Sequence, residues 1–231
     1  MKQQRKSTTS LAAGLAALFL LTLAGANTLG AEAPDSGFIP AAVAGKMEEV
    51  KVDDKHKAKR WINTEMTGDK YKAIMIDPVI FYPAPDPSPQ VSSSVLKQIA
   101  DYLTDSLRRQ IGAHLNVVDQ AGPGVLRMQP AMTAVTVKKE GLSPLDVLPV
   151  HLAFSAAKAA TGNTDETVTA MIEVRITDSV SRSDQAAVTV GIESSTQLEN
   201  EKDQLTLKDF EYALDQSATR ASNAIVKALG R

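Results

Sequence analysis

Apolar and polar residues alternate with a period of two in the second half of the chain, and this pattern predicts a β-hairpin. Residues 167–177 read TVTAMIEVRIT, and residues 186–193 repeat the alternation after the polar turn DSVSRSD. Strict alternation is typical of a strand with one buried face. Two such strands joined by a short polar turn predict antiparallel pairing.

Other segments repeat their apolar residues every three or four positions, which is the spacing of an amphipathic helix. Residues 92–112 begin with serines suited to an N-cap and end at Gly112. Residues 206–229 begin with TLKD, which resembles a capping box. Residues 143–162 form a third candidate helix that is apolar nearly all round. A helix of that kind is either buried or covered by a partner.

Dense apolar runs predict further strands at residues 71–82, 115–119 and 125–138. Proline cannot donate to a strand ladder, so Pro78 and Pro130 indicate bulges or edge positions. The expected order of elements is β-α-β-β-α-β-β-α. We therefore expect an α+β fold, a two-layer sandwich in which a mixed or mainly antiparallel sheet is packed by about three helices.

The first apolar run of the chain has the form of a secretion signal. Three basic residues precede the run at residues 11–23, which is shorter than the roughly 20 residues of a transmembrane helix. Ala24 and Ala26 then fit the A-x-A cleavage pattern, which makes Asn27 the expected first residue of the mature protein. The alternative is an uncleaved N-terminal anchor.

This boundary predicts three parts in the chain. Residues 1–26 are the expected signal peptide, residues 27–60 a flexible and charged N-terminal arm, and residues 61–231 a single α+β domain. Ten of the fifteen residues from 46 to 60 are charged. Such a density of charge favours a solvated arm or a short exposed helix.

Composition excludes several classes of function. The chain contains no cysteine, which excludes disulfides, thiolate metal sites and cysteine nucleophiles. Its net charge of −2 argues against nucleic-acid binding, which needs clustered positive charge. The three histidines lie far apart and form no metal-binding pattern. We expect no metal and no cofactor.

One short motif suggests an enzyme. Ser155 and Lys158 form the pattern S-x-x-K, the nucleophile motif of penicillin-binding proteins and serine β-lactamases. Residues three apart on a helix share a face, so the lysine could assist the serine as a base. Those enzymes also need a K-T-G element, which this sequence lacks. We expect no enzymatic activity, and a serine hydrolase or penicillin-interacting enzyme is the alternative.

Two segments could bind a partner. Prolines at every second position of residues 83–89 favour a stiff, extended loop, and residues 148–154 are strongly apolar. The candidate partner surface consists of Pro83, Pro85, Pro87, Pro89, Leu148, Val150, Leu152 and Phe154. These segments favour a non-catalytic role, in which the protein binds another envelope protein or an assembly. A periplasmic carrier of a small ligand is a further alternative.

The order of segments resembles a bacterial envelope family, the domain of unknown function 3313. The likeness rests on SGFIP, YKAIMIDPVIFYPAP, VLKQIADYLTDSLRRQI, VVDQAGPGVLRMQPAMTAV, LPVHLAFSAAKAATG and MIEVRITDS. This resemblance implies an envelope location and supplies no catalytic residue. Members typically have the form of lipoproteins, whereas this chain has Ala26 where a lipoprotein carries its lipidated cysteine.

The lipid of a lipoprotein is attached through a thiol sulfur, and alanine offers none. The sequence therefore predicts an exported protein without a covalent lipid anchor. We expect it to be periplasmic or associated with the outer membrane of a Gram-negative bacterium.

Overall fold

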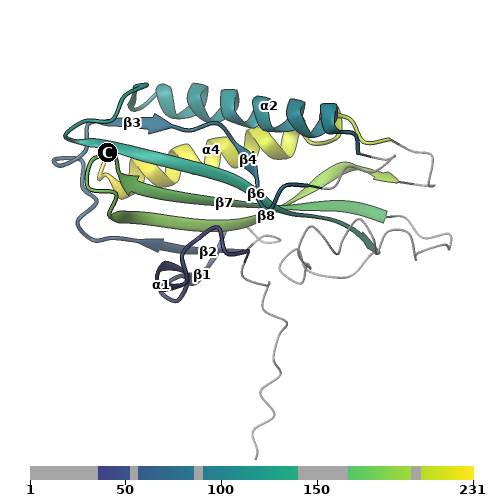
Figure 1. Cartoon of the computed structure of the whole chain (residues 1–231), viewed down its shortest axis with the longest axis horizontal. Helices are drawn as coiled ribbons and strands as arrows, with labels where there is room; N and C mark the ends of the chain where they lie inside the picture. Colours follow the sequence, from purple (N-terminus) through teal and green to yellow (C-terminus); the bar gives the residue numbers. More distant parts are fainter. Residues whose placement is uncertain (1–35, 53–56, 86–90, 140–165, 199–203) are drawn as a thin grey trace, which may run out of the picture. The chain divides into compact units, whose positions relative to one another are not determined.

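The computed structural model describes residues 36–52, 57–85, 91–139, 166–198 and 204–231 (Figure 1). The helices of this part are α1 (Ala41–Ala44), α2 (Ser93–Gly112) and α4 (Glu211–Ala228), with a 3₁₀ turn, η3 (Leu207–Asp209), before α4. The strands are β1 (Glu48–Lys51), β2 (Lys57–Ile62), β3 (Ala73–Ile76), β4 (Ile80–Phe81), β5 (Asn116–Val117), β6 (Val125–Lys139), β7 (Glu166–Asp178) and β8 (Asp184–Leu198).

These strands form one mixed sheet. Its order is β1-β2-β8-β7-β6-β3-β5, and the short β4 also pairs with β6. The pairs β1–β2, β2–β8, β8–β7 and β7–β6 are antiparallel. By contrast, β3 and β4 run parallel to β6, and β5 runs parallel to β3. The α+β class and the mixed sheet that the sequence predicts are therefore confirmed.

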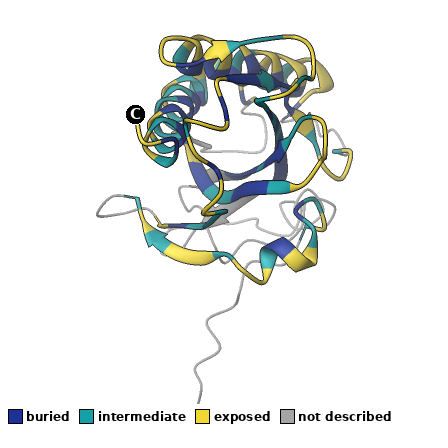
Figure 2. Ribbon diagram, turned by 90° about the vertical axis from the view of Figure 1, so that its left-hand side faces the viewer, coloured by how far each residue is buried: buried dark blue, intermediate teal, exposed yellow. Residues whose placement is uncertain are grey.

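The main core lies between this sheet and the helices α2 and α4, which run along one side of it (Figure 1). Figure 2 shows the buried residues gathered where the strands and helices face each other. Alternate residues of β7 point into this layer, and Ala170, Ile172, Val174 and Ile176 are all buried. We call this side of the sheet its inner face and the opposite side its outer face.

The β7–β8 hairpin follows the alternation in the sequence. Its register pairs Ile176 with Ala186 and Val174 with Val188, so apolar residues share the inner face. Asp178 organises the turn, because its carboxylate accepts hydrogen bonds from the backbone N–H groups of Val180 and Ser181. Aspartate is favoured in turns for this reason.

The run at residues 71–82 divides into two strands around Pro78. Residues 77–79 lie between β3 and β4, so β6 has no ladder partner on that side at Pro130. The carbonyl oxygens of Met128 and Met132 accept hydrogen bonds from the backbone N–H groups of Asp77 and Tyr82, the residues directly after β3 and β4. The missing N–H of Pro130 therefore falls at the gap. The irregularity in β6 lies elsewhere, between Met132 and Ala134.

Helix α2 begins at its predicted cap, whereas α4 begins at Glu211, a few residues after the predicted capping box. The side chain of Ser92 accepts a hydrogen bond from the backbone N–H of Val95 at the start of α2. Thr206 and Asp209 form a reciprocal capping box, which encloses η3 before α4 begins. The expected helix at residues 143–162 lies outside the described residues.

The C-terminal end of α4 lies against the loop before β3. A Cβ atom on Gly68 would stand 2.4 Å from the carbonyl oxygen of Leu229, so this approach requires glycine. Arg231 also donates a hydrogen bond to the carbonyl oxygen of Tyr71. These contacts hold the last turn of α4 beside the segment that follows β2.

The sequence predicts a flexible, charged arm at residues 27–60. This prediction is wrong for the described part of that range. β1 and β2 pair with each other, and β2 pairs with β8 along the sheet. Before them, Ile39 and Val43 pack with Ala187 in a small apolar cluster on the outer face. The density of charge was misleading because β1 and β2 join the sheet through their backbones, while most of their side chains stay exposed or half-buried.

Candidate ligand-binding pocket

A pocket lies between the inner face of the sheet and α4. The sheet side is built by alternate residues of three neighbouring strands: Ala58, Arg60 and Ile62 of β2, Ala186, Val188 and Val190 of β8, and Ile172, Val174 and Ile176 of β7. Because β2 pairs with β8 and β8 with β7, these residues form one continuous surface. Val50 and Val52 extend it at the β1 edge.

The helix side of the pocket is a stripe of small residues. Ser217, Ala221, Ala224 and Ala228 lie three or four positions apart on α4, so they share one helical face. Each of these side chains is half-buried. Small side chains fill little of the space between a helix and a sheet, so this stripe leaves an opening opposite β8 and β2.

The pocket has a volume of about 370 Å³. Small-molecule sites have volumes of roughly 300–1,000 Å³ and are lined mainly by apolar side chains. Leu103 and Leu107 of α2 and Met128 of β6 close its inner end, where they belong to the main core. The pocket is therefore an open continuation of the core, of a size suited to a small ligand.

The charged residues among the described lining are all basic. Lys51 of β1 and Arg60 of β2 come from the sheet, and Arg220 and Lys227 come from α4. The described lining residues include no aspartate, glutamate or histidine. The pocket thus combines an apolar interior with positive charge from both of its walls.

Arg60 lies at an unusual place for a charged side chain. It stands between Ala58 and Ile62 on the inner face of β2 and is half-buried. Within the described part of the chain, no hydrogen bond or ion pair of its guanidinium group is found. A charge that leaves water without a partner is costly, so this guanidinium is well placed to meet an anion.

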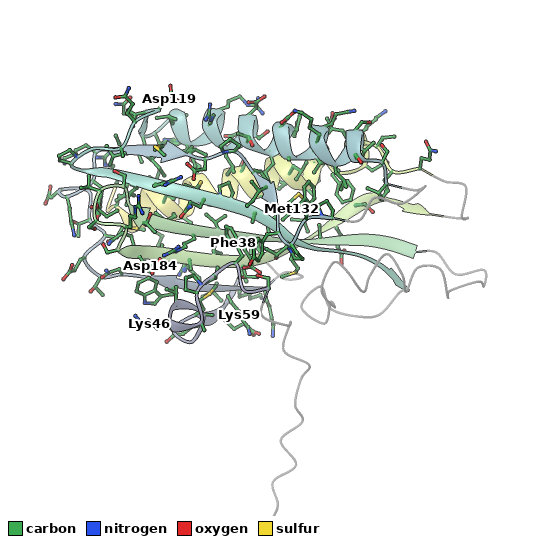
Figure 3. The ribbon with its side chains drawn as sticks, viewed as in Figure 1. Phe38, Lys46, Lys59, Asp119, Met132 and Asp184 are labelled. Carbon is green, nitrogen blue, oxygen red and sulfur yellow. The ribbon has the colours of Figure 1, made fainter. Side chains whose placement is uncertain are left out.

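The outer face holds the other notable polar cluster. Glu173 of β7 is only 7% exposed, and its carboxylate accepts hydrogen bonds from Ser36 at 2.9 Å and Thr133 at 2.8 Å. Lys46 and Lys59 also lie on the side of the sheet away from α4 (Figure 3). The Nζ atom of Lys46 stands 5.0 Å from the centroid of the Trp61 ring. These contacts attach the N-terminal segment and lie outside the pocket.

The site residues expected from the sequence are mostly outside the described residues. This applies to Ala24, Ala26 and Asn27 of the signal cleavage site, Ser155 and Lys158 of the S-x-x-K motif, and Pro87, Pro89, Leu148, Val150, Leu152 and Phe154 of the partner surface. All of these assignments stay predictions.

Pro83 and Pro85 are described and follow β4. Pro83 is exposed, and neither proline lines the pocket. The ring of Tyr82 contacts the ring of Phe38 with their centroids 5.7 Å apart, so the start of the proline loop lies against the N-terminal segment. Ile80 and Tyr82 nearby keep 48% and 40% of their surface exposed.

Sequence reasoning missed the pocket residues on β2 and α4. A signal was present in KAKRWI at residues 57–62, where Ala58, Arg60 and Ile62 share a strand face. The alternation was hidden by the charge density of residues 46–60, which favoured a solvated segment. The small residues of α4 recur at helical spacing, but this periodicity does not indicate how far the helix lies from the sheet.

The described residues provide neither a three-residue metal site nor a membrane-spanning helix. No group of three histidine, aspartate or glutamate side chains there is arranged to hold a metal ion. Among the helices of the same residues, none is long and apolar enough to cross a membrane.

Comparison with protein families assigns most of the chain to a family. The family model described as protein of unknown function DUF3313 matches residues 35–221, which is most of the chain. The chain belongs to the DUF3313 family. The match begins before α1 and so includes β1 and β2, in agreement with their place in the sheet.

The chain is also similar to the uncharacterized lipoprotein YdcL of Escherichia coli, in strains K12 and O157:H7. The identity is 29% over 163 residues, which cover 71% of this chain and 73% of YdcL.

Two solved structures are examples of a distant likeness. The PelC dodecamer from Paraburkholderia phytofirmans has 8% identity and a TM-score of 0.34, covering 75% of this chain and 96% of that one. A hypothetical protein from Chlamydia trachomatis has 7% identity and a TM-score of 0.40, covering 70% and 99%. TM-scores this low carry no conclusion about this protein.

Proposed function

We propose that this protein is a non-catalytic binding protein of the bacterial envelope, which holds a small and largely apolar ligand between α4 and strands β2, β8 and β7. The observation that carries the proposal is the pocket of about 370 Å³, open between the two layers and lined mainly by apolar side chains. Of the alternatives that the sequence leaves open, the small-ligand carrier is the one that this geometry supports best.

The energetic reason is that the pocket leaves apolar surface without packing partners. Val188 and Val190 of β8 face the alanine stripe of α4 across the open space and stay half-buried. Burial of apolar surface is favourable by roughly 25 cal/mol per Å², or about 0.8 kcal/mol for each methylene group. An apolar ligand of matching size would recover this energy, together with the missing van der Waals contacts.

The proposed location is the periplasm or the periplasmic side of the outer membrane. Its support is the signal-like run at residues 11–23, the cleavage pattern at Ala24 and Ala26, and the lipoprotein relative. The chain has no cysteine, so we expect export without a covalent lipid anchor.

The proposal can be tested with a neutral apolar dye. N-phenyl-naphthylamine becomes fluorescent in apolar surroundings, and we expect it to bind the purified protein. Ala224→Phe places a ring in the pocket from the alanine stripe, so it should weaken dye binding at least about tenfold. The fold should stay stable, because filling a cavity commonly adds about 0.5–2 kcal/mol to stability.

Asn223→Phe is the matched control. Asn223 is the neighbouring residue on α4 and is exposed to solvent, so the same ring there lies outside the pocket. We expect this variant to bind the dye like the parent protein. Equal dye binding by Ala224→Phe and its control, or no binding by the parent protein, would contradict the proposal.

A protein-binding role is the second candidate. It is favoured by the exposed side chains of Ile80 and Tyr82, which adjoin Pro83 and Pro85 of the expected partner surface. The hydrolase alternative with Ser155 and Lys158 stays a prediction, which labelling of Ser155 by a fluorescent penicillin would support.

A further inference from the structure

We infer that the ligand of this pocket is an anionic single-chain amphiphile of the fatty-acid type, whose carboxylate is bound by Arg60 and Lys227. The inference rests on the function proposed above, because it names the chemistry of the ligand for the same pocket. Its hydrocarbon chain lies along the apolar surface between β8 and the alanine stripe of α4.

Arg60 is the first observation that points to an anionic head group. The strand pairing places Val188 on one side of Arg60 and Glu48 on the other, and Ala58 and Ile62 flank it on the same face. Arginine presents a planar fork of N–H donors that matches a carboxylate with two hydrogen bonds. A half-buried guanidinium beside an apolar space is therefore suited to the head of an amphiphile.

The opposite wall of the pocket carries positive charge as well. Lys227 lies seven residues after Arg220 on α4, which is two turns, so both face the pocket beside the alanine stripe. The two arginines and two lysines of the lining come from β1, β2 and α4, which approach one another only in the folded chain. An anion at the mouth would meet cations from the sheet and from the helix.

In the described residues, the acidic side chains of β1 next to Arg60 and Lys57 are not part of the pocket lining. Glu48 pairs with Arg60 along the β1–β2 ladder, but it is exposed and does not line the pocket. Glu49 forms a salt bridge with Lys57, and neither of these two residues is part of the lining. The charges that face the cavity favour an anion over a neutral or cationic head group.

The volume of the pocket sets the size of the chain. At roughly 30 Å³ for a group the size of one water molecule, the volume of about 370 Å³ holds about twelve such groups. A saturated chain of about twelve carbons is therefore the first choice for an experiment. Each methylene group that enters the pocket should tighten binding by about fourfold.

The experiment compares three ligands with the same twelve-carbon chain and different heads. Dodecanoate, dodecanol and dodecyltrimethylammonium compete with N-phenyl-naphthylamine for the full-length protein, below their micelle concentrations. We expect dodecanoate to displace the dye at a concentration about tenfold or more below that of dodecanol, because hydrogen bonds to charged groups are the stronger ones. The ammonium compound should be the weakest of the three.

The double variant Arg60→Gln/Lys227→Gln isolates the head group. It should remove most of the preference for dodecanoate over dodecanol and leave dodecanol binding unchanged. The control Lys72→Gln/Lys208→Gln loses the same net charge at two exposed residues outside the pocket, and it should keep the preference. Thermal melts of both variants show whether the fold is retained.

The outcomes separate this inference from the proposed function. If dodecanol and dodecanoate bind equally, or if the preference survives in Arg60→Gln/Lys227→Gln, the inference of an anionic ligand is overturned. The proposed binding of an apolar ligand is then still supported. If neither these ligands nor the dye bind, both are overturned. Self-association that blocks the dye would also overturn this inference, because a second copy of the chain would then fill the pocket.

Discussion

At the scale of single residues, Tyr71 is a buried core side chain whose polar group needs a hydrogen-bond partner. Its side chain has no exposed surface, and its hydroxyl donates a hydrogen bond to Asp178 at 3.1 Å. Burial raises the pKa of Tyr71 to about 12, and the hydrogen bond to Asp178 adds to the effect. The pKa of Asp178 is lowered, chiefly by the hydrogen bond from the backbone N–H of Ser181. These residues connect the start of β3 with the β7–β8 turn.

Tyr71→Phe tests this arrangement at alkaline pH. A raised pKa in the folded state means that Tyr71 contributes stability fully below pH 10, and that this contribution is lost as the pH rises towards 12. The variant should be less stable at pH 7 by about 1–3 kcal/mol, because a hydrogen bond to a charged group is lost. Urea unfolding from pH 7 to 11 should show a shallower alkaline fall in the variant.

Tyr212→Phe is the control for this measurement. Tyr212 is 73% exposed, so its replacement should leave both the stability at pH 7 and the alkaline slope unchanged. An alkaline slope in Tyr71→Phe equal to that of the parent protein would show that Tyr71 does not titrate as expected.

At the scale of elements, α2 and α4 are joined by polar contacts as well as by their apolar stripes. Asp215 of α4 accepts hydrogen bonds from Tyr102 at 3.0 Å and from Ser106 at 2.8 Å, both on α2. Arg109 stands 3.5 Å from the same carboxylate and donates a hydrogen bond to Ser106. Further along, Ser222 donates to the backbone carbonyl of Gln110. These bonds hold α4 beside α2, which leaves its alanine stripe directed at the pocket.

Asp215→Ala should therefore destabilise the contact between the two helices. Ser106 is fully buried and would lose its acceptor, so we expect a cost of about 1–3 kcal/mol in chemical unfolding. Asp101→Ala is the control, because its salt bridge with Lys97 is exposed and such pairs contribute about 0–1 kcal/mol. An equal effect of the two substitutions would argue against a special role of Asp215.

At the scale of the whole described structure, the sheet carries helices on one face and the N-terminal segment on the other. Ile39 and Val43 are buried against Ala187 of β8, and β1 follows them directly along the chain. Val50 and Lys51 near the end of β1 line the pocket. The packing of the outer face thus helps to position an edge of the site on the inner face.

Ile39→Ala tests this connection. Replacing a buried isoleucine by alanine typically costs about 2–5 kcal/mol, and this small cluster has few other contacts to compensate. We expect earlier proteolysis between residues 36 and 51 and weaker binding of N-phenyl-naphthylamine. Val180→Ala in the exposed β7–β8 turn should change neither, with stability within about 0.5 kcal/mol. If Ile39→Ala is cleaved earlier but binds the dye as before, the packing of the outer face does not influence the pocket.

Local patterns in the sequence predicted those elements whose stability depends on near neighbours. The alternation in β7 and β8, the Ser92 cap of α2 and the capping box at Thr206 each involve residues close together in the sequence. The α+β class follows from these elements. The place of β2 beside β8 was not predicted, because Arg60 meets Val188 only through pairing between distant segments.

The sequence by itself determined which faces of β7, β8, α2 and α4 are buried, because periodicity records the direction of each side chain relative to its element. Only the tertiary structure decided how much space remains between those faces. The pocket depends on the small residues of α4, on the helix contacts at Asp215 and on the pairing of β2 with β8. The size of a cavity depends on the distance between the packed layers. Contacts between distant segments set that distance, so no single segment of the sequence determines it.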